Sequence, residues 1–104
     1  MKPLLLSVLV IAALTAAPEK HFFTGVITDS MCALGDHTQM KMGPTDAECT
    51  IACIREHGAT YVLYDGKKAY DLSNQPEKFA GKRVTVTGTL NANTIQVDSI
   101  ALAK

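Results

Sequence analysis

All three cysteines of this chain lie in one stretch, residues 29–58, which follows a first β-like run and precedes several others. The same stretch holds two of the three histidines and three of the four methionines. Cysteine and histidine are the side chains that form disulfides and bind transition metals. A chain of 104 residues buries only a modest core, so a covalent or metal cross-link in this stretch would add to its stability.

The second half of this stretch predicts an α-helix over residues 46–57. Thr45 and Glu48 form a T-x-x-E capping box at its start, in which the Thr45 hydroxyl accepts from the Glu48 amide. Gly58 suits the left-handed cap at its end. Both helix ends are therefore specified locally.

Two lines of side chains run along this predicted helix on different faces. One is an apolar stripe of Ala47, Ile51 and Ile54, and the other, at intervals of four residues, is Cys49, Cys53 and His57. If the isoleucines face the sheet, the cysteines point away from it. We therefore expect the cysteines to meet residues 30–44, a long loop without hydrophobic period that holds Cys32.

The rest of the chain predicts β-strands, because β-branched and aromatic residues alternate between turn residues. The expected strands are residues 22–28, 60–64, 67–72, 83–90 and 94–102, with a two-residue hairpin at Asp65-Gly66 and a short helical turn within 74–81. The inward parity changes near Asp98-Ser99, which indicates a bulge. This pattern predicts a mainly β fold with a short helical insert: a small five-stranded OB-like barrel, in the order β-α-β-β-α-β-β.

The N-terminal residues 1–17 have the features of a secretory signal peptide. Lys2 provides the positive start, and residues 4–14 form an apolar run that is too short to span a bilayer. We expect cleavage after Ala16 or Ala17, a signal peptide over residues 1–17, and a single OB-like domain over residues 18–104 with its loop–helix insert at 30–58. The expected location is secreted or periplasmic, with no membrane attachment after cleavage.

Two groups of residues also resemble a known family. Residues 79–90 and 94–100 are similar to the last two strands of small OB-fold proteins. The segment GVITDSMC at 25–32, then His37, then Cys49-x-x-x-Cys53, resembles a domain-of-unknown-function family of small secreted bacterial proteins. The resemblance implies a signal peptide, an OB-like barrel and a Cys/His-bearing insert after the first strand. It implies no particular activity.

One interpretation of the cysteines is a structural disulfide. An exported protein meets an oxidising compartment, where Cys32 would pair with either Cys49 or Cys53 and tie the loop to the helix. Closing a loop of this length stabilises a fold by about 3 kcal/mol. A bridge between Cys49 and Cys53, one helical turn apart, suits disulfide geometry poorly.

The alternative interpretation is a metal site. Cys32, His37, Cys49 and Cys53 would give a Cys₃His set, which suits tetrahedral zinc. Soft ligands, including Met40 and Met42, would instead favour copper(I). The spacing C-x-x-x-C differs from the usual zinc knuckle, so the sequence leaves disulfide and metal open.

The remaining residues predict a binding protein rather than an enzyme, since no catalytic constellation is apparent. Loss of Lys2 with the signal leaves 9 Lys+Arg against 10 Asp+Glu, so no basic surplus favours nucleic acid. A single-stranded nucleic-acid or oligosaccharide binder, with Tyr61, Tyr64 and Tyr70 as stacking surfaces, is a further alternative. The expected partner is a small ligand or a protein whose identity, like the oligomeric state, the sequence does not specify.

Overall fold

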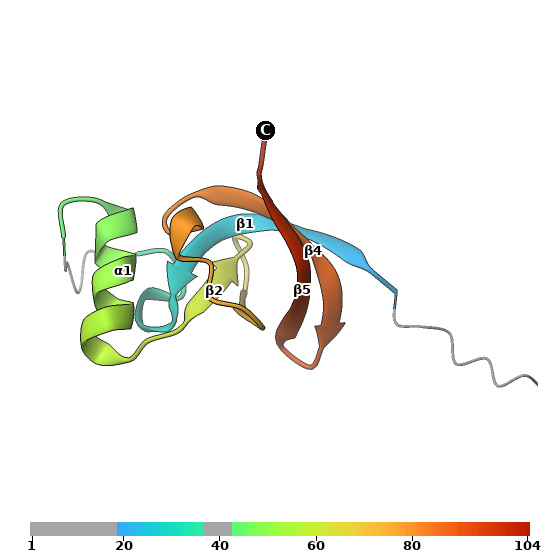
Figure 1. The fold of residues 1–104 in the computed structure, drawn as a ribbon, viewed down its shortest axis with the longest axis horizontal. Coiled ribbons are helices and arrows are strands. Elements are labelled where there is room, and N and C mark those ends of the chain that lie inside the picture. The colour runs from blue at the N-terminus through green and yellow to red at the C-terminus, as the bar shows by residue number, and fades with distance from the viewer. Residues whose placement is uncertain (1–18, 37–42) are drawn as a thin grey trace, which may run out of the picture.

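Five strands in a ring-like sheet and one α-helix make up the part of the chain that the computed structural model describes, residues 19–36 and 43–104 (Figure 1). The mainly β fold predicted from the sequence is confirmed. In order, the elements are β1 His21–Asp29, the 3₁₀ turn η1 Ser30–Cys32, α1 Asp46–His57, β2 Tyr61–Tyr64, β3 Ala69–Leu72, the 3₁₀ turn η2 Glu77–Phe79, β4 Arg83–Asn91 and β5 Thr94–Leu102. The predicted signal peptide and the candidate metal ligands His37, Met40 and Met42 lie outside the described residues.

The strands follow one another around the ring as β1-β2-β3-β5-β4, and β4 pairs back with β1. All of these pairs are antiparallel except β3 with β5, which run parallel through Asp71–Thr94 and Leu72–Ile95. β1 lies against β2 with its C-terminal half and against β4 with its N-terminal half. The long first strand therefore joins both sides of the ring.

The bulge expected in the last strand is present. Thr87 pairs with Ser99, but the next residue, Gly88, pairs with Val97, so Asp98 is the extra residue in β5. A Cβ atom on Gly88 would lie 2.1 Å from the Gln96 carbonyl oxygen, so only glycine fits there. The bulge bends β5 and lets the sheet curve into a ring.

The hairpin between β2 and β3 differs from the prediction. The last pair is Tyr64 with Ala69, so the connection has four residues rather than two, and β3 begins two residues later than expected. The Asp65 carboxylate accepts from the backbone amides of Lys67 (2.8 Å) and Lys68 (2.9 Å). These bonds hold both amides in the turn, so the two residues do not join the strand.

The core inside the ring is apolar and is closed at one end by α1. Its buried members are Ile27, Tyr61, Leu63, Leu72, Ala80, Val84, Val86 and Ile95. The predicted apolar stripe of the helix, Ala47, Ile51 and Ile54, packs against it, as does Phe79 of η2. The other helix line is therefore turned away from this core, as expected.

Within the described residues, no helix has the length and apolar character needed to cross a membrane.

Candidate metal-binding site

The first side chain of the site is Asp29, the last residue of β1. It shares the inward parity of Ile27 and is completely buried. One carboxylate oxygen, Oδ1, accepts from the backbone amides of Met31 (3.0 Å) and Cys32 (2.9 Å). Asp29 therefore caps η1, and this local turn brings the Cys32 side chain to the end of the strand.

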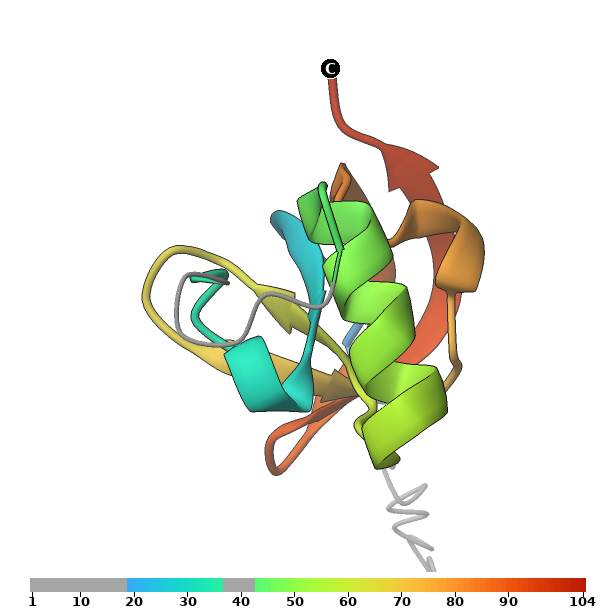
Figure 2. The same cartoon turned by 90° about the vertical axis from the view of Figure 1, so that its left-hand side faces the viewer.

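The turn that carries Cys32 is held by the segment after the helix. The Ser30 amide donates to the Thr60 carbonyl (2.8 Å), and the Thr60 amide donates to Ser30 Oγ (3.0 Å). The Thr28 hydroxyl donates to the Cys32 carbonyl (3.0 Å). These bonds position η1 beside α1 (Figure 1, Figure 2).

The helix supplies the other thiols. Its start and end are those the sequence predicts: Thr45 Oγ1 accepts from the Glu48 amide (3.1 Å), and Gly58 adopts a φ of 68°. The face turned away from the apolar core carries Cys49 and Cys53, which are 1% and 0% exposed. Together with Ala59 they form a second buried cluster, separate from the core of the ring.

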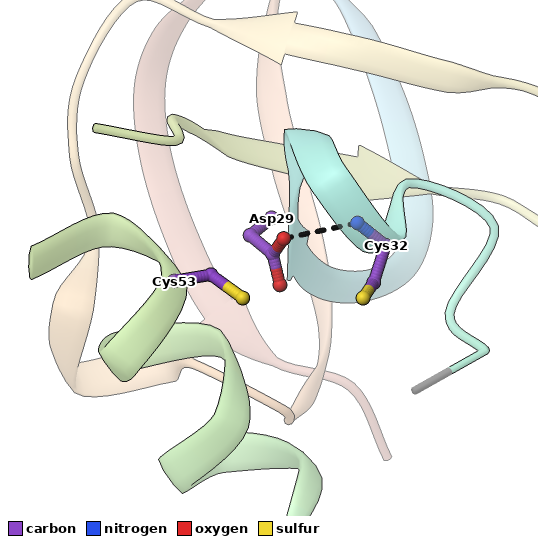
Figure 3. A group of neighbouring side chains, drawn as sticks. All are labelled: Asp29, Cys32 and Cys53. Atoms are coloured by element: carbon purple, nitrogen blue, oxygen red, sulfur yellow. Dashed lines mark hydrogen bonds between the residues drawn. The ribbon is translucent and has the colours of Figure 1, made fainter. Parts of the chain in front are cut away.

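Asp29, Cys32 and Cys53 converge on one point (Figure 3). One carboxylate oxygen of Asp29 and the two Sγ atoms all lie within 4.8 Å of one another, and all three residues are buried. The carboxylate lies between the two sulfur atoms. Its second oxygen, Oδ2, is buried and has no hydrogen-bond partner among the residues that the structure describes.

The environment of the thiols keeps them protonated at neutral pH. Burial and, second, the negative charge of Asp29 together raise the pKa of Cys53 to about 12. Burial and Asp29 also raise the pKa of Cys32. In both cases Cys49 acts in the same direction. Only a strong cation would convert such thiols to thiolates near neutral pH.

The structure brings together two of the four residues predicted as metal ligands, Cys32 and Cys53. The third, Cys49, is buried in a cluster with Cys53 but does not belong to the group of converging ligand atoms. The fourth, His37, lies outside the described residues. His57, on the same helix line, is exposed at the helix end, where it suits the dipole. The structure describes all three cysteines, and no disulfide joins them.

Asp29 is the residue that the sequence analysis missed. An acidic residue at a strand end usually forms a turn, and Asp29 does cap η1. The available signal was its parity: in β1 it follows Gly25 and Ile27 at intervals of two, which places it on a buried face. A carboxylate on such a face, three residues before a cysteine, is a pattern that could have been found.

The tyrosines proposed as stacking surfaces have other contacts. Tyr61 is buried in the core, and the Tyr70 ring packs against Phe23 with ring centres 5.4 Å apart. The Lys68 amino group lies 4.6 Å from the centre of the Tyr70 ring. This distribution gives no row of exposed rings along the described part of the sheet.

Comparisons of the chain with models of protein families, with curated proteins and with solved structures gave no match. The resemblance to a family of small secreted proteins therefore stays a prediction, and the function is argued from the site.

Proposed function

We propose that this chain is an exported, non-enzymatic OB-like domain that binds zinc at Asp29, Cys32 and Cys53, with Cys49 as a fourth donor. The observation that carries the proposal is the buried Asp29 oxygen without a partner, next to two buried sulfur atoms. The metal would tie the end of β1 to α1. It would thereby fix the insert on the ring.

The charge of Asp29 supports a bound cation. A buried carboxylate is costly unless a positive charge or hydrogen bonds compensate it. Across residues 19–36 and 43–104, no lysine, arginine or histidine lies within ion-pair distance of Asp29. A divalent cation would supply the missing positive charge and satisfy Oδ2 at the same time.

The donor set favours zinc over copper(I). Zinc binds thiolates and carboxylates together in tetrahedral sites, whereas copper(I) selects soft sulfur ligands. Zinc bonds of about 2.0–2.3 Å place neighbouring donor atoms about 3.5 Å apart. The atoms of this site, within 4.8 Å of one another, would need to move by about 1 Å to reach that geometry.

The test is zinc titration of the reduced, metal-stripped chain in competition with a chromophoric chelator. We expect one zinc per chain, and cobalt(II) at the same site should give the optical bands of tetrahedral thiolate coordination. Asp29→Asn and Cys53→Ser should weaken zinc binding by at least the roughly 10–100-fold that losing an outer-shell partner costs.

Two control variants remove groups that can bind zinc at exposed positions away from the site. Asp98→Asn removes a carboxylate on β5, and His57→Ala removes an imidazole on α1. Neither should change zinc affinity. A wild-type chain that binds no zinc, or an Asp29→Asn chain that binds as tightly as the wild type, would contradict the proposal.

A second candidate is a binding module whose insert is stapled by a disulfide. It is favoured by the nearness of the Cys32 and Cys53 sulfur atoms and by the expected export to an oxidising compartment. A disulfide would leave the Asp29 charge uncompensated, which is why we rank it second. Elemental analysis with a thiol count on protein from its native compartment separates the two: one metal and three thiols, or no metal and one thiol.

We also infer that the ring is an OB-like barrel. The order β1-β2-β3-β5-β4, the parallel β3–β5 pair and the β4–β1 pair support this inference. In an OB barrel an oligonucleotide or oligosaccharide binds on the outer face of strands 2 and 3 and the loops beside it. Because Tyr61 is buried and the charge is balanced, we rank that function below metal binding.

A further inference from the structure

We propose that oxidation gates this metal site: Cys32 and Cys53 form a disulfide that excludes zinc, so the chain holds the metal only when reduced. This inference rests on the proposed zinc site and adds its regulation. The two states use the same two sulfur atoms, so they cannot coexist.

The first support is the placement of the two sulfur atoms. They lie within 4.8 Å of each other and come from separate elements, η1 and α1. A disulfide has a bond of about 2.05 Å, a change that rotation of a cysteine side chain between rotamers can supply. The bridge would close a loop of about 20 residues, a length for which a disulfide stabilises a fold.

The third cysteine does not compete well for this bond. Cys49 precedes Cys53 by one helical turn on the same element, and residues so placed suit disulfide geometry poorly. Cys49 is also absent from the group of ligand atoms that lie within 4.8 Å of one another, which holds the sulfur atoms of Cys32 and Cys53. The bridge from Cys32 to Cys53 is therefore favoured. Cys49 would remain a thiol in the oxidised chain.

The exposed fractions of the two cysteines indicate which of them reacts first with an oxidant. Cys32 is 7% exposed and sits at the end of a single 3₁₀ turn, whereas Cys53 is 0% exposed within a helix. An oxidant from solution therefore meets Cys32 first. The buried Cys53 is then placed to attack the mixed disulfide that Cys32 forms with the oxidant.

The reaction balances with a small-molecule disulfide, RSSR, as the oxidant. Cys32 and Cys53 react as thiolates, which zinc binding supplies in the loaded chain and which form in the metal-free chain when each thiol gives its proton to solvent. The Cys32 thiolate attacks one sulfur of RSSR, a Cys32–SR bond forms, and one RS⁻ leaves. The Cys53 thiolate then attacks the Cys32 sulfur, the protein disulfide forms, and the second RS⁻ leaves. The two protein thiolates lose two electrons, RSSR gains them, and Zn²⁺ departs with its charge unchanged.

Asp29 makes the two states differ in more than their covalent bond. In the reduced, zinc-loaded state its carboxylate faces a cation. In the oxidised state it is buried beside a neutral disulfide with Oδ2 again unpartnered. The oxidised state therefore keeps the insert in place but leaves an uncompensated charge, which favours return to the reduced state when thiols are available.

The experiment exposes the reduced full chain, with and without zinc, to glutathione buffers of increasing GSSG:GSH ratio. Zinc release is followed with a chromophoric chelator, and the bridged residues are identified by alkylation and peptide mass spectrometry. We expect one zinc released per Cys32–Cys53 disulfide formed, and zinc should shift the midpoint toward more oxidising buffers.

Two variants separate the steps. Cys53→Ser should stop at a glutathione adduct on Cys32, because the resolving thiol is gone. Cys49→Ser, the matched control, should still form the Cys32–Cys53 bridge in the metal-free chain. A metal-free chain that forms no such bridge, or a zinc-loaded chain that keeps its metal while the bridge forms, overturns the gating.

The two proposals fail in different measurements. Zinc binding is measured on the reduced chain, before any oxidant is added. Disulfide formation is measured on the metal-free chain, where zinc plays no part. Zinc binding without a bridge therefore overturns the gating alone, and a bridge without zinc binding overturns the proposed function.

Discussion

Two buried groups of side chains in this protein differ in the charge that they hold. The core of the ring consists mostly of aliphatic side chains such as Ile27, Val86 and Ile95, and its unpartnered polar atom, the Tyr61 hydroxyl oxygen, belongs to a neutral group. The group between η1 and α1, formed by Asp29, Cys32 and Cys53, holds two thiols and a carboxylate whose Oδ2 has no hydrogen-bond partner among the described residues. The first group stabilises the fold by packing, whereas the second buries a carboxylate oxygen that no described residue satisfies. This difference is why the second is the functional candidate.

The largest effect should come from the ring core. Ile95→Ala removes a fully buried side chain from β5 and leaves a cavity, so we expect a loss of about 2–5 kcal/mol in the free energy of unfolding. Urea denaturation with and without zinc measures it. The loss should be the same in both conditions, since Ile95 belongs to the other cluster; a loss that depends on zinc would break the distinction between the two.

Asp29→Asn should have effects of opposite sign with and without zinc. The amide oxygen can still accept from the Met31 and Cys32 amides, so the cap of η1 is retained. In the metal-free chain the change removes an uncompensated buried charge and should stabilise the fold by about 1–3 kcal/mol. With zinc at about 100 times its Kd, the wild type gains about 2.7 kcal/mol and the variant far less. Thermal or urea unfolding of both chains, in chelator and in zinc, measures the two effects. If the metal-free variant is less stable than the metal-free wild type, the buried charge of Asp29 does not destabilise the fold.

The metal-free chain should lose stability in alkaline solution. The folded-state pKa of Cys53 is raised from 9.0 to about 12, so its contribution is complete below pH 9 and is lost as the pH rises toward 12. The loss from this thiol should reach about 1 kcal/mol by pH 10. Burial also raises the pKa of Tyr61 and Tyr70, so urea unfolding between pH 7 and 10 should be compared with Cys53→Ala. The variant should show a shallower decline, and an equal decline would mean that Cys53 is not responsible.

The smallest effect should come from the contact between α1 and η2. The Arg55 guanidinium donates to both Glu77 carboxylate oxygens, at 3.0 and 3.2 Å, but both side chains are largely exposed. Arg55→Met should cost less than about 1 kcal/mol, and the cost should shrink at high salt. Lys82→Met, at an exposed site, is the control for loss of a surface cation. A cost above 2 kcal/mol would show that this pair, rather than the buried clusters, holds the helix on the ring.

The features that the sequence predicted correctly are those set by neighbouring residues. The limits of α1 follow from Thr45 and Gly58, and the bulge at Asp98 follows from a change of parity along one strand. The one local error, the width of the hairpin after Tyr64, arose because the Asp65 side chain competes for two backbone amides. Side-chain competition of this kind is not visible in strand propensity.

The sequence by itself determined the strands, the capped helix and the separation of its cysteines from its apolar stripe, because each of these depends on hydrogen bonds and periodicity within a few residues. Only the tertiary structure decided the parallel contact of β3 with β5 and the role of Asp29. Asp29 and Cys53 are 24 positions apart and meet because α1 packs across the end of the ring. The energy of a buried charge depends on the groups that surround it, and packing between distant segments brings those groups together.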